Sequence, residues 1–482
     1  MPNALMSRYH GIVDDVQAFE ASIRSPLPRF VWSNPARCSP ERLGQLLTES
    51  RFQPEPLPWL PGAFRINGPQ QGLGSHWAFL AGFYHIQEAS SMLPVLLLNP
   101  AKAGRVLDLC AAPGNKTAQI ALAMDNRGTV VANDHVWNRM RPVRMHIDRL
   151  GLLNVSLSCE DGGSYPRSAG TFDRVLVDAP CSCEGTSRKS PGVLAAKTTQ
   201  RQRQQLQQKQ VRLLRQAIRR CNPGGRVVYS TCTYAPEENE AVIDRVLGEM
   251  PDTFRILTAE IPGFATTPGI TEWRGARFDR RLERTLRVWP HRNDTGGFFM
   301  AVLEKSAPAA PLPPAPEFLS RQDKQSLRIE TIDSKNRSAI LDLLEQRFGI
   351  DRSSFLEMRL LLRNHRDVFV VTADHQPPPR LEACPGIPLV HLAMRYPKLT
   401  TAGAAAFGRK ATRNRIDTDA QQLRAYLKRA PFRLTAAQVR SLSSDGYVIV
   451  RHQEAPLGLG FYRSDSETVA SRFPKSLSPT AS

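Results

Sequence analysis

Short apolar runs alternate with helix-length amphipathic segments between residues 104 and 306. The first five runs are RVLDLC (105–110), GTVVAND (128–134), NVSLSCED (154–161), FDRVLVDAP (172–180) and GGRVVYSTC (224–232). Segments with helical periodicity separate them, including KTAQIALAM (116–124) and QVRLLRQAIRRC (210–221). Strands that alternate with helices predict an α/β fold with a parallel sheet covered on both faces.

Three further apolar runs follow closely in the chain: FRILTAEI (254–261), RTLRVWPH (284–291) and GGFFMAVLEK (296–305). Their short connections favour an antiparallel pair at the edge of the sheet. We therefore expect about seven strands in total.

The regions on either side differ from this α/β region in composition and in hydropathy pattern. Residues 1–90 contain the Pro-rich stretches SPLPRFVWSNP (25–35) and FQPEPLPWLPG (52–62), and we expect an irregular accessory domain there. APAAPLPPAPEF (307–318) predicts an extended linker, although a surface loop within one larger domain is an open alternative. Beyond it, GYVIVRHQEAPLGLGFYR (446–463) predicts two strands joined by a turn. The expected units are 1–90, 91–306, the linker 307–318, 319–395 and 396–482.

Composition narrows the class of protein. A chain of 482 residues suggests about three domains, and its longest early apolar cluster, MLPVLLL (92–98), is too short to span a bilayer. The N-terminus shows no secretory signal, so we expect a cytoplasmic protein whose eight cysteines are reduced. The net charge of +19 favours a polyanionic partner. A nucleic acid is favoured over an anionic membrane surface as this partner. The alternative that the positive charge only keeps the protein soluble stays open.

The first strand runs into a tight turn that opens a helix, in RVLDLCAAPGNKTAQI (105–120). Such a turn presents backbone N–H groups to a ligand at the carboxyl end of the strand. Asp134 ends the next strand, where doubly wound folds place a carboxylate on ribose hydroxyls, and Asp161 could accept from an adenine amino group. The turn matches neither G-x-G-x-x-G nor a Walker motif, so S-adenosylmethionine fits better than a dinucleotide or ATP. Each carboxylate alone is more often an ordinary polar strand end.

Cysteines follow the fourth and fifth strands, in VLVDAPCSCEG (175–185) and VVYSTCTYAP (227–236). A free cysteine is usually a small buried hydrophobic residue. Cys232 however precedes an expected helix start near Pro236, where the helix dipole would favour a thiolate, although Glu237 and Glu238 oppose this effect. The C-x-C of Cys181 and Cys183 lacks a second ligand pair, so we expect no metal.

Several segments together resemble the NOL1/NOP2/Sun family of RNA cytosine-5 methyltransferases. They are HIQEASSMLP (85–94), DLCAAPGNKT (108–117), FDRVLVDAPCSCEGTSRKSP (172–191), NPGGRVVYSTCTYAPEENE (222–240) and PHRNDTGGFFMAVLEK (290–305). The resemblance implies a class I, Rossmann-like methyltransferase fold that uses S-adenosylmethionine and no metal. It also implies an RNA-binding role for residues 1–90, an intermediate domain at 319–395 and a PUA-like RNA-binding module at 396–482.

The resemblance implies roles for individual residues as well. Cys232 would be the nucleophile that adds to C6 of cytosine, Cys181 would assist product release, and Asp178 would hold or protonate N3. DNA cytosine methyltransferases place their nucleophile in a P-C segment like Pro180–Cys181, so the residues alone leave both thiols open, and the family resemblance favours Cys232. The implied cofactor-binding residues are Ala111, Ala112, Pro113, Gly114, Asn115, Lys116, Thr117, Asp134, Asp161 and Asp178. Asn115 and Cys183 stand where the family commonly has glycine, and Cys183 has no expected role.

The resemblance implies that the substrate is 16S rRNA within the small ribosomal subunit, at cytosine 1407 in small-subunit numbering. We expect a monomeric enzyme. Arg188 and Lys189 follow the cysteine loop and could hold phosphates, whereas the basic helix at 201–220 could equally be a solvated face. A different rRNA or tRNA cytosine is an alternative target. A DNA cytosine methyltransferase would need a large recognition insertion, which is absent from this sequence, and a catalytically silent RNA-binding factor would not need both cysteines.

Overall fold

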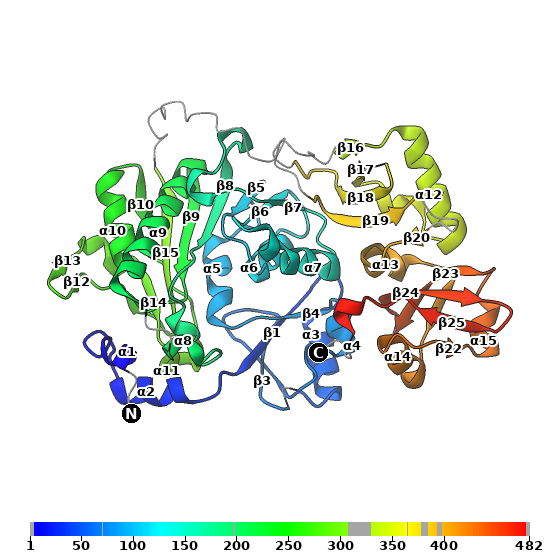
Figure 1. Cartoon of the computed structure of the whole chain (residues 1–482), viewed down its shortest axis with the longest axis horizontal. Coiled ribbons are helices and arrows are strands. Elements are labelled where there is room, and N and C mark those ends of the chain that lie inside the picture. Colours follow the sequence, from blue (N-terminus) through cyan, green and yellow to red (C-terminus); the bar gives the residue numbers. More distant parts are fainter. Residues whose placement is uncertain are drawn as a thin grey trace.

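A computed structural model describes residues 4–69, 71–195, 198–306, 329–363, 365–376, 384–392 and 398–478. Among them, nine strands form one large sheet in the order β11-β14-β15-β9-β8-β5-β6-β7, with β10 paired to β15 (Figure 1). Its parallel strands are β5 (Arg105–Asp108), β6 (Thr129–Asn133), β7 (Val155–Ser158), β8 (Phe172–Asp178) and β9 (Cys221–Thr231). Its antiparallel strands are β10 (Phe254–Ile256), β11 (Thr267–Pro268), β14 (Leu286–Val288) and β15 (Phe298–Lys305).

The parallel sheet and its antiparallel edge agree with the sequence pattern, but nine strands exceed the expected seven. One reason is that β11 has only two residues, which is too short to give a hydropathy pattern. Another is that β10 pairs with β15 outside the linear strand order.

Helices cover both faces of the sheet, as the continuous apolar strands require. The helices α5 (Leu93–Leu98), α6 (Asn115–Ala123) and α7 (Met140–Leu150) share one core cluster with Val106 and Val130. The helices α9 (Gln200–Arg220) and α10 (Glu240–Glu249) share the other with Leu107 and Val131. Successive strand residues therefore face opposite layers.

The N-terminal region is more regular than expected. The strands β1 (Arg29–Ser33), β2 (Pro54–Pro56), β3 (Ala63–Ile66) and β4 (Tyr84–Ile86) form an antiparallel sheet in the order β2-β3-β1-β4. The expectation of an irregular region was wrong because these strands are short and Pro-flanked, so they show no clear alternation. The helices of this region are α1 (Ala4–Ser7), α2 (Val16–Arg24), α3 (Pro40–Glu49) and α4 (Trp77–Leu80).

Two further sheets follow the large one in sequence, and the expected linker at 307–318 lies outside the described residues. The first contains β16 (Ile329–Thr331), β17 (Met358–Arg363), β18 (Asp367–Thr372), β19 (Ile387–His391) and β20 (Lys398–Leu399), beside α12 (Ser334–Phe348). The second has the order β21-β23-β24-β25-β22 and contains β21 (Arg415–Asp417), β22 (Phe432–Arg433), β23 (Gly446–His452), β24 (Ala455–Arg463) and β25 (Thr468–Ser471). The strands predicted within 446–463 are confirmed as β23 and β24.

The remaining elements are short. The helices are α8 (Gly192–Ala195), α11 (Pro290–Asn293), α13 (Thr401–Phe407), α14 (Ala420–Leu427) and α15 (Ala436–Arg440), and a small hairpin joins β12 (Glu272–Trp273) to β13 (Ala276–Arg277).

These parts pack against one another (Figure 1). The backbone N–H of Gly386, just before β19, donates to the carbonyl of Val155 in β7 at 2.8 Å, which covers an otherwise open strand edge. The N-terminal sheet and the β21–β25 sheet share one apolar cluster. Beside it, the rings of Trp77 and His452 pack with their centroids 5.1 Å apart. Among the described residues, no helix combines the length and the apolar character needed to cross a membrane.

Candidate active site

The carboxyl ends of the parallel strands bring the predicted residues to one edge of the sheet. Asp108 of β5 is paired in register with Ala132 of β6 and with Leu176 of β8, and Asp178 ends β8 opposite Ser230 of β9. The loops that follow β5, β6, β7, β8 and β9 therefore emerge side by side, where ligands bind in open α/β sheets.

The turn after β5 is tightly held. The N–H of Ala111 donates to the carbonyl of Asn133 at 2.7 Å, and Ala112–Pro113 is a cis peptide. Gly114 has φ +107°, and a Cβ there would lie 2.8 Å from Val143 Cα. Asn115 instead begins α6 with helical geometry, so glycine is needed at 114 and not at 115.

Two predicted cofactor residues in α6 hold neighbouring carboxylates. Lys116 Nζ donates to Asp178 Oδ2 at 2.7 Å and to Ser91 Oγ at 2.9 Å, while Ser230 Oγ donates to Asp178 Oδ1 at 2.9 Å. Thr117 Oγ1 donates to Asp108 Oδ2 at 2.6 Å. Burial raises the pKa of Asp108 to about 7, and its Oδ1 has no hydrogen-bond partner among the described residues.

Asp134 and Asp161 follow β6 and β7. The Asp134 carboxylate is buried, accepts from Val136 N at 3.0 Å and pairs with Arg139 Nη1 at 3.2 Å. Asp161 caps a short 3₁₀ turn, accepting from Gly163 N at 3.0 Å and from Ser164 Oγ at 3.1 Å. Two carboxylates beside a backbone turn suit the hydroxyl and amino groups of an adenosine moiety, and the unpartnered Asp108 Oδ1 leaves an acceptor in the same region.

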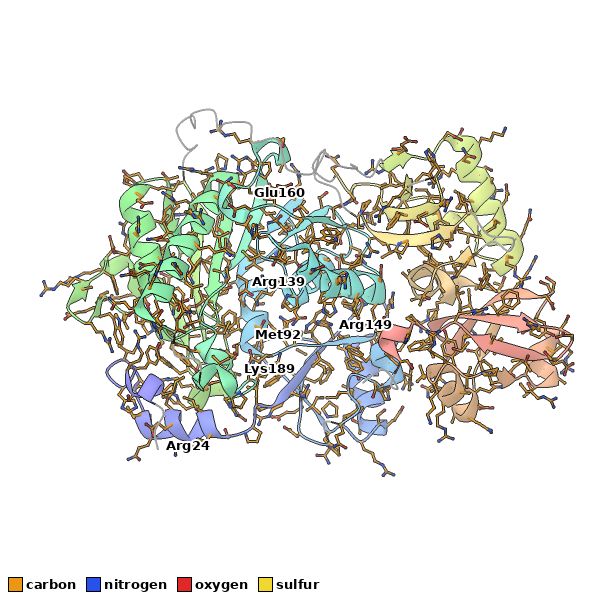
Figure 2. All side chains as sticks on the ribbon, in the orientation of Figure 1. Arg24, Met92, Arg139, Arg149, Glu160 and Lys189 are labelled. Atoms are coloured by element: carbon orange, nitrogen blue, oxygen red, sulfur yellow. The ribbon has the colours of Figure 1, made fainter. Side chains whose placement is uncertain are left out.

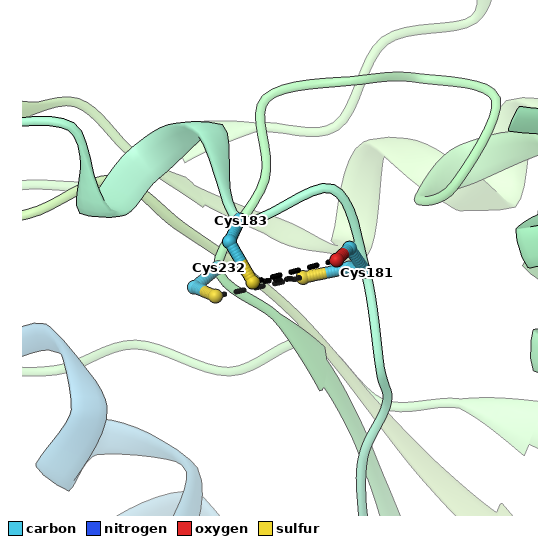
Figure 3. A group of neighbouring side chains, drawn as sticks. All are labelled: Cys181, Cys183 and Cys232. Carbon is cyan, nitrogen blue, oxygen red and sulfur yellow. Dashed lines mark hydrogen bonds between the residues drawn. The ribbon is translucent and has the colours of Figure 1, made fainter. Parts of the chain in front are cut away.

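Three thiols meet where the loops after β8 and β9 approach each other (Figure 3). Cys181 Sγ lies 3.5 Å from Cys232 Sγ and 3.9 Å from Cys183 Sγ. Hydrogen bonds from Cys181 and Cys232 lower the pKa of Cys183 to about 3. The hydrogen bond from Cys181 also lowers the pKa of Cys232, but its own bond to Cys183 and its burial outweigh this and raise the pKa above the ordinary value. The protonation states of the three thiols are therefore coupled to one another.

The expected helix start beside Cys232 was wrong. Pro236 lies in a turn and α10 begins only at Glu240, eight residues beyond Cys232, so the helix dipole does not act on this thiol. Glu237 accepts from Arg8 and from Trp273, whereas Glu238 is buried and accepts from Ser182 N at 3.0 Å.

Sequence reasoning missed a buried network that joins the two cysteine loops. Glu184 accepts from Arg203 Nη2 at 2.8 Å, from Thr233 Oγ1 at 3.2 Å and from the Tyr9 hydroxyl. Ser182 Oγ and Thr233 Oγ1 lie 2.7 Å apart, and Gly185 N donates to the Cys232 carbonyl at 2.9 Å. Glu184 stands directly after the C-x-C segment, and a charged residue beside two cysteines could have indicated a buried ion pair. Its partners Tyr9, Arg203 and Thr233 are too distant in sequence to be predicted.

His85 of β4 was also missed. Arg149 Nη2 donates to His85 Nδ1 at 2.7 Å, so the neutral ring carries its proton on Nε2, which donates to Asn115 Oδ1 at 3.0 Å. Burial lowers the pKa of His85 well below its ordinary range, which keeps the ring neutral. The N-terminal sheet thereby supports the first turn of α6.

The two residues predicted to contact RNA occupy different environments. The Arg188 side chain is 1% exposed and donates to Asp294 Oδ1 at 2.6 Å and to the carbonyls of Thr295 and Pro26. Lys189 is exposed (Figure 2). The donors of Arg188 are thus engaged within the protein, which weighs against a phosphate contact, whereas Lys189 is available. In α9, Arg203 and Arg220 are buried while Arg201 and Arg212 are exposed, so only part of its basic character faces solvent.

Comparisons with known proteins agree with this geometry. A family described as "16S rRNA methyltransferase RsmB/F" matches residues 95–304. A tRNA (cytosine(49)-C(5))-methyltransferase from Pyrococcus abyssi is 35% identical over 303 residues, covering 62% of this chain and 95% of the relative. A ribosomal RNA small subunit methyltransferase F from Erwinia tasmaniensis is 36% identical over 306 residues, covering 62% of this chain and also 62% of the relative, less than two thirds of its length. The crystal structure of a methyltransferase homologue from Pyrococcus horikoshii superposes with a TM-score of 0.55 at 32% identity, covering 62% of this chain and 93% of that one.

Proposed function

The chain belongs to the RsmB/F (NOL1/NOP2/Sun) family of RNA cytosine-C5 methyltransferases, and on that premise we propose that it methylates C5 of a cytosine in 16S rRNA through a covalent adduct with Cys232. One observation carries the proposal: Cys232 Sγ and Cys181 Sγ lie 3.5 Å apart at the edge of the sheet that also presents Asp178 and Lys116. The proposed reaction needs one thiol that bonds to C6 of cytosine and a second group that helps this thiol to leave after methylation. Two neighbouring thiols can supply both roles.

The nucleophile is needed because C5 of cytosine reacts poorly with a methyl sulfonium. Addition of a thiolate to C6 makes C5 electron-rich, as in enamines. Cys232 forms the S–C6 bond, and the electron pair displaced from the ring is stabilised when N3 is held or protonated. For that role we propose Asp178, whose ion pair with Lys116 at 2.7 Å would let a proton pass from the ammonium through the carboxyl group to N3.

Bound S-adenosylmethionine would supply the electrophilic methyl group. The residues that would hold it are Asp134 and Asp161 for its adenosine part and the turn from Ala111 to Thr117 for its backbone contacts. After methylation a base, water in the simplest case, takes the C5 proton, and the S–C6 electron pair leaves with Cys232 as a thiolate. Cys181 Sγ, 3.5 Å from Cys232 Sγ, can donate a hydrogen bond to that departing thiolate.

The proposed target is cytosine 1407 of the decoding region, in small-subunit rRNA numbering, in an assembling or complete small subunit. The relatives named small subunit methyltransferase F support 16S rRNA, and the net charge of +19 supports a nucleic acid of any kind. A tRNA cytosine is the second candidate, because the matched region spans 95% of the Pyrococcus tRNA enzyme.

The test offers three RNAs to the purified protein with radiolabelled S-adenosylmethionine: unmodified small subunits, naked 16S rRNA and unmodified tRNA. We expect 5-methylcytosine at one 16S position and none in tRNA. Label in tRNA alone would replace the proposed substrate with the second candidate, and binding without label in any RNA would favour a silent RNA-binding factor.

A further inference from the structure

The three thiols of Cys181, Cys183 and Cys232, called the thiol cluster below, have the arrangement of a three-sulfur metal site. All three Sγ atoms lie within 4.8 Å of one another (Figure 3). Zinc binds thiolates at about 2.3 Å, and three ligands at that distance lie about 4 Å from each other. The Sγ–Sγ separations of 3.5 and 3.9 Å are close to this spacing, so an ion needs only small side-chain movements to bind.

The loops that carry the thiols are held rigidly. Ser182, between two of the cysteines, is fixed through its N–H on Glu238 and through its hydroxyl on Thr233. The carbonyl of Cys232 accepts from Gly185 N at 2.9 Å. Ligands on a pre-organised backbone lose little conformational entropy when they bind an ion.

Cys183 provides a second, independent observation. Its φ is +58°, in the left-handed region that favours glycine, so a side chain at this position has a conformational cost. The proposed methylation uses Cys232 and Cys181 only, which leaves the Cys183 thiol without a part in the chemistry. This strained residue nevertheless supplies the third sulfur of the thiol cluster.

We propose that the thiol cluster is an inhibitory binding site for Zn²⁺, coordinated by Cys181, Cys183 and Cys232 with the fourth position left to water. The cluster contains only sulfur ligands, which favour soft or borderline ions and not Mg²⁺ or Ca²⁺. As each Zn–S bond forms, a thiol that is still protonated releases its proton to solvent. The ion is not a cofactor of methylation, since it occupies the sulfur that must attack C6.

The proposal of ion binding rests on geometry alone, whereas the proposal of inhibition also rests on the proposed role of Cys232. Metal binding and methylation are therefore measured separately. The full chain, reduced with a phosphine, is titrated with Co²⁺ while thiolate-to-cobalt charge-transfer absorption is followed. Zn²⁺ then displaces the Co²⁺ in competition with a chelating dye. We expect one equivalent of either ion and a thiolate charge-transfer band.

Cys183→Gly is the decisive variant because glycine suits the left-handed backbone, so the variant is expected to fold with an unchanged or higher Tm. Loss of a group that only orients a metal ligand costs about 10–100-fold in affinity, and we expect removal of this ligand to cost at least tenfold. Cys384→Ser is the matched control, since this free thiol lies before β19, outside the cluster, and its loss should leave Zn²⁺ affinity unchanged.

Methylation assays complete the test. Zn²⁺ should abolish methylation by the native chain, a chelator should restore it, and Cys183→Gly should stay active at Zn²⁺ concentrations at least tenfold higher. Absence of the charge-transfer band, or equal Zn²⁺ affinity in Cys183→Gly, would overturn the site. Binding of Zn²⁺ with undiminished methylation would overturn the inhibition and argue against Cys232 as the nucleophile, while the titration itself stays informative even if no RNA is methylated.

Discussion

Gly114 sets the backbone of the turn that we assign to the cofactor. Its φ is +107°, and a Cβ at this position would lie only 2.8 Å from Val143 Cα, which leaves no room for a side chain. Gly114→Ala should therefore lower the free energy of unfolding by about 1–3 kcal/mol and raise the KM for S-adenosylmethionine. Denaturant unfolding and initial rates measure the two effects.

Gly248→Ala is the control for this prediction. Gly248 lies within α10, and a Cβ there would have no atom of the described residues within 4 Å, apart from the helix's own backbone and the neighbouring residues. Alanine should be neutral or stabilising by up to about 1 kcal/mol with an unchanged KM. Equal effects of the two substitutions would show that the turn does not depend on Gly114.

At the residue scale, the sequence predicted which side chains gather at the sheet edge because strand ends in a parallel sheet share one edge. It did not predict how they pair. The Lys116–Asp178 ion pair and the approach of Cys183 to Cys181 depend on side-chain directions in loops, for which residue types carry no periodic signal. The glycine requirement at 114 and the helical geometry of Asn115 likewise follow only from the packing of α6 against α7.

At the scale of elements, one buried ion pair links α9 to the cysteine loop. Glu184 and Arg203 are 1% and 9% exposed, and Tyr9 and Thr233 also donate to Glu184. Glu184→Gln would leave Arg203 with a buried charge whose second carboxylate contact, Glu238, lies 3.8 Å away. We expect a loss of about 3 kcal/mol in unfolding free energy and a lower kcat, because both cysteine loops lose their support.

Glu249→Gln provides the comparison for that prediction. Glu249 pairs with Arg215 and Arg245 in a partly exposed position, where an ion pair contributes about 0–1 kcal/mol. Chemical denaturation of both variants and single-turnover rates would separate support of the loops from a general loss of charge. A Glu184→Gln protein as stable as Glu249→Gln would contradict the network.

Elements with a long periodic pattern were predicted well, and short ones were not. The basic helix expected at 201–220 is α9, which begins with a capping box of Thr199 and Gln202. The predicted start of α10 is too early because proline favours a first helical position, whereas Pro236 begins a turn that precedes the helix. Three-residue strands such as β2 and β4 have too few positions to show alternation.

At the scale of the whole molecule, neutral histidines that are buried or half-buried lie in several parts of the chain. Burial lowers the pKa of His76, His146 and His375 to about 4 in each case, and His375 Nε2 contacts Ser156 Oγ of β7 at 2.8 Å. The unfolded chain takes up protons below about pH 6.5, while these folded histidines resist protonation until about pH 4. The stability that these neutral histidines contribute is therefore fully present above about pH 6.5, and it is lost as the pH falls from there towards 4.

The size of this loss can be measured at one histidine. At pH 5 each such group costs about 2 kcal/mol relative to pH 7. His375→Gln should reduce the fall in Tm between pH 7 and pH 5, whereas His365→Asn, at an exposed position, should not. An identical pH dependence in both variants would mean that His375 does not contribute.

The arrangement of the sheets could not be predicted from the sequence. The hydropathy pattern identifies the faces of a strand but not the partner that covers them, and the contacts of Ser156 in β7 with His375 and Pro385 join segments more than two hundred positions apart. The shared cluster of the N-terminal sheet and the β21–β25 sheet joins even more distant segments. The division into domains at the stated boundaries stays a prediction.

The role of Cys232 as nucleophile is tested by identifying the cysteine that bonds to RNA. Cys181→Ala protein, incubated with unmodified 16S rRNA and S-adenosylmethionine, should accumulate a covalent complex that resists denaturing electrophoresis. Mass spectrometry after nuclease and protease digestion should locate the nucleotide on the peptide containing Cys232. Cys232→Ala should give no adduct and no methylation, whereas an adduct on Cys181 in that variant would contradict the assignment of the nucleophile.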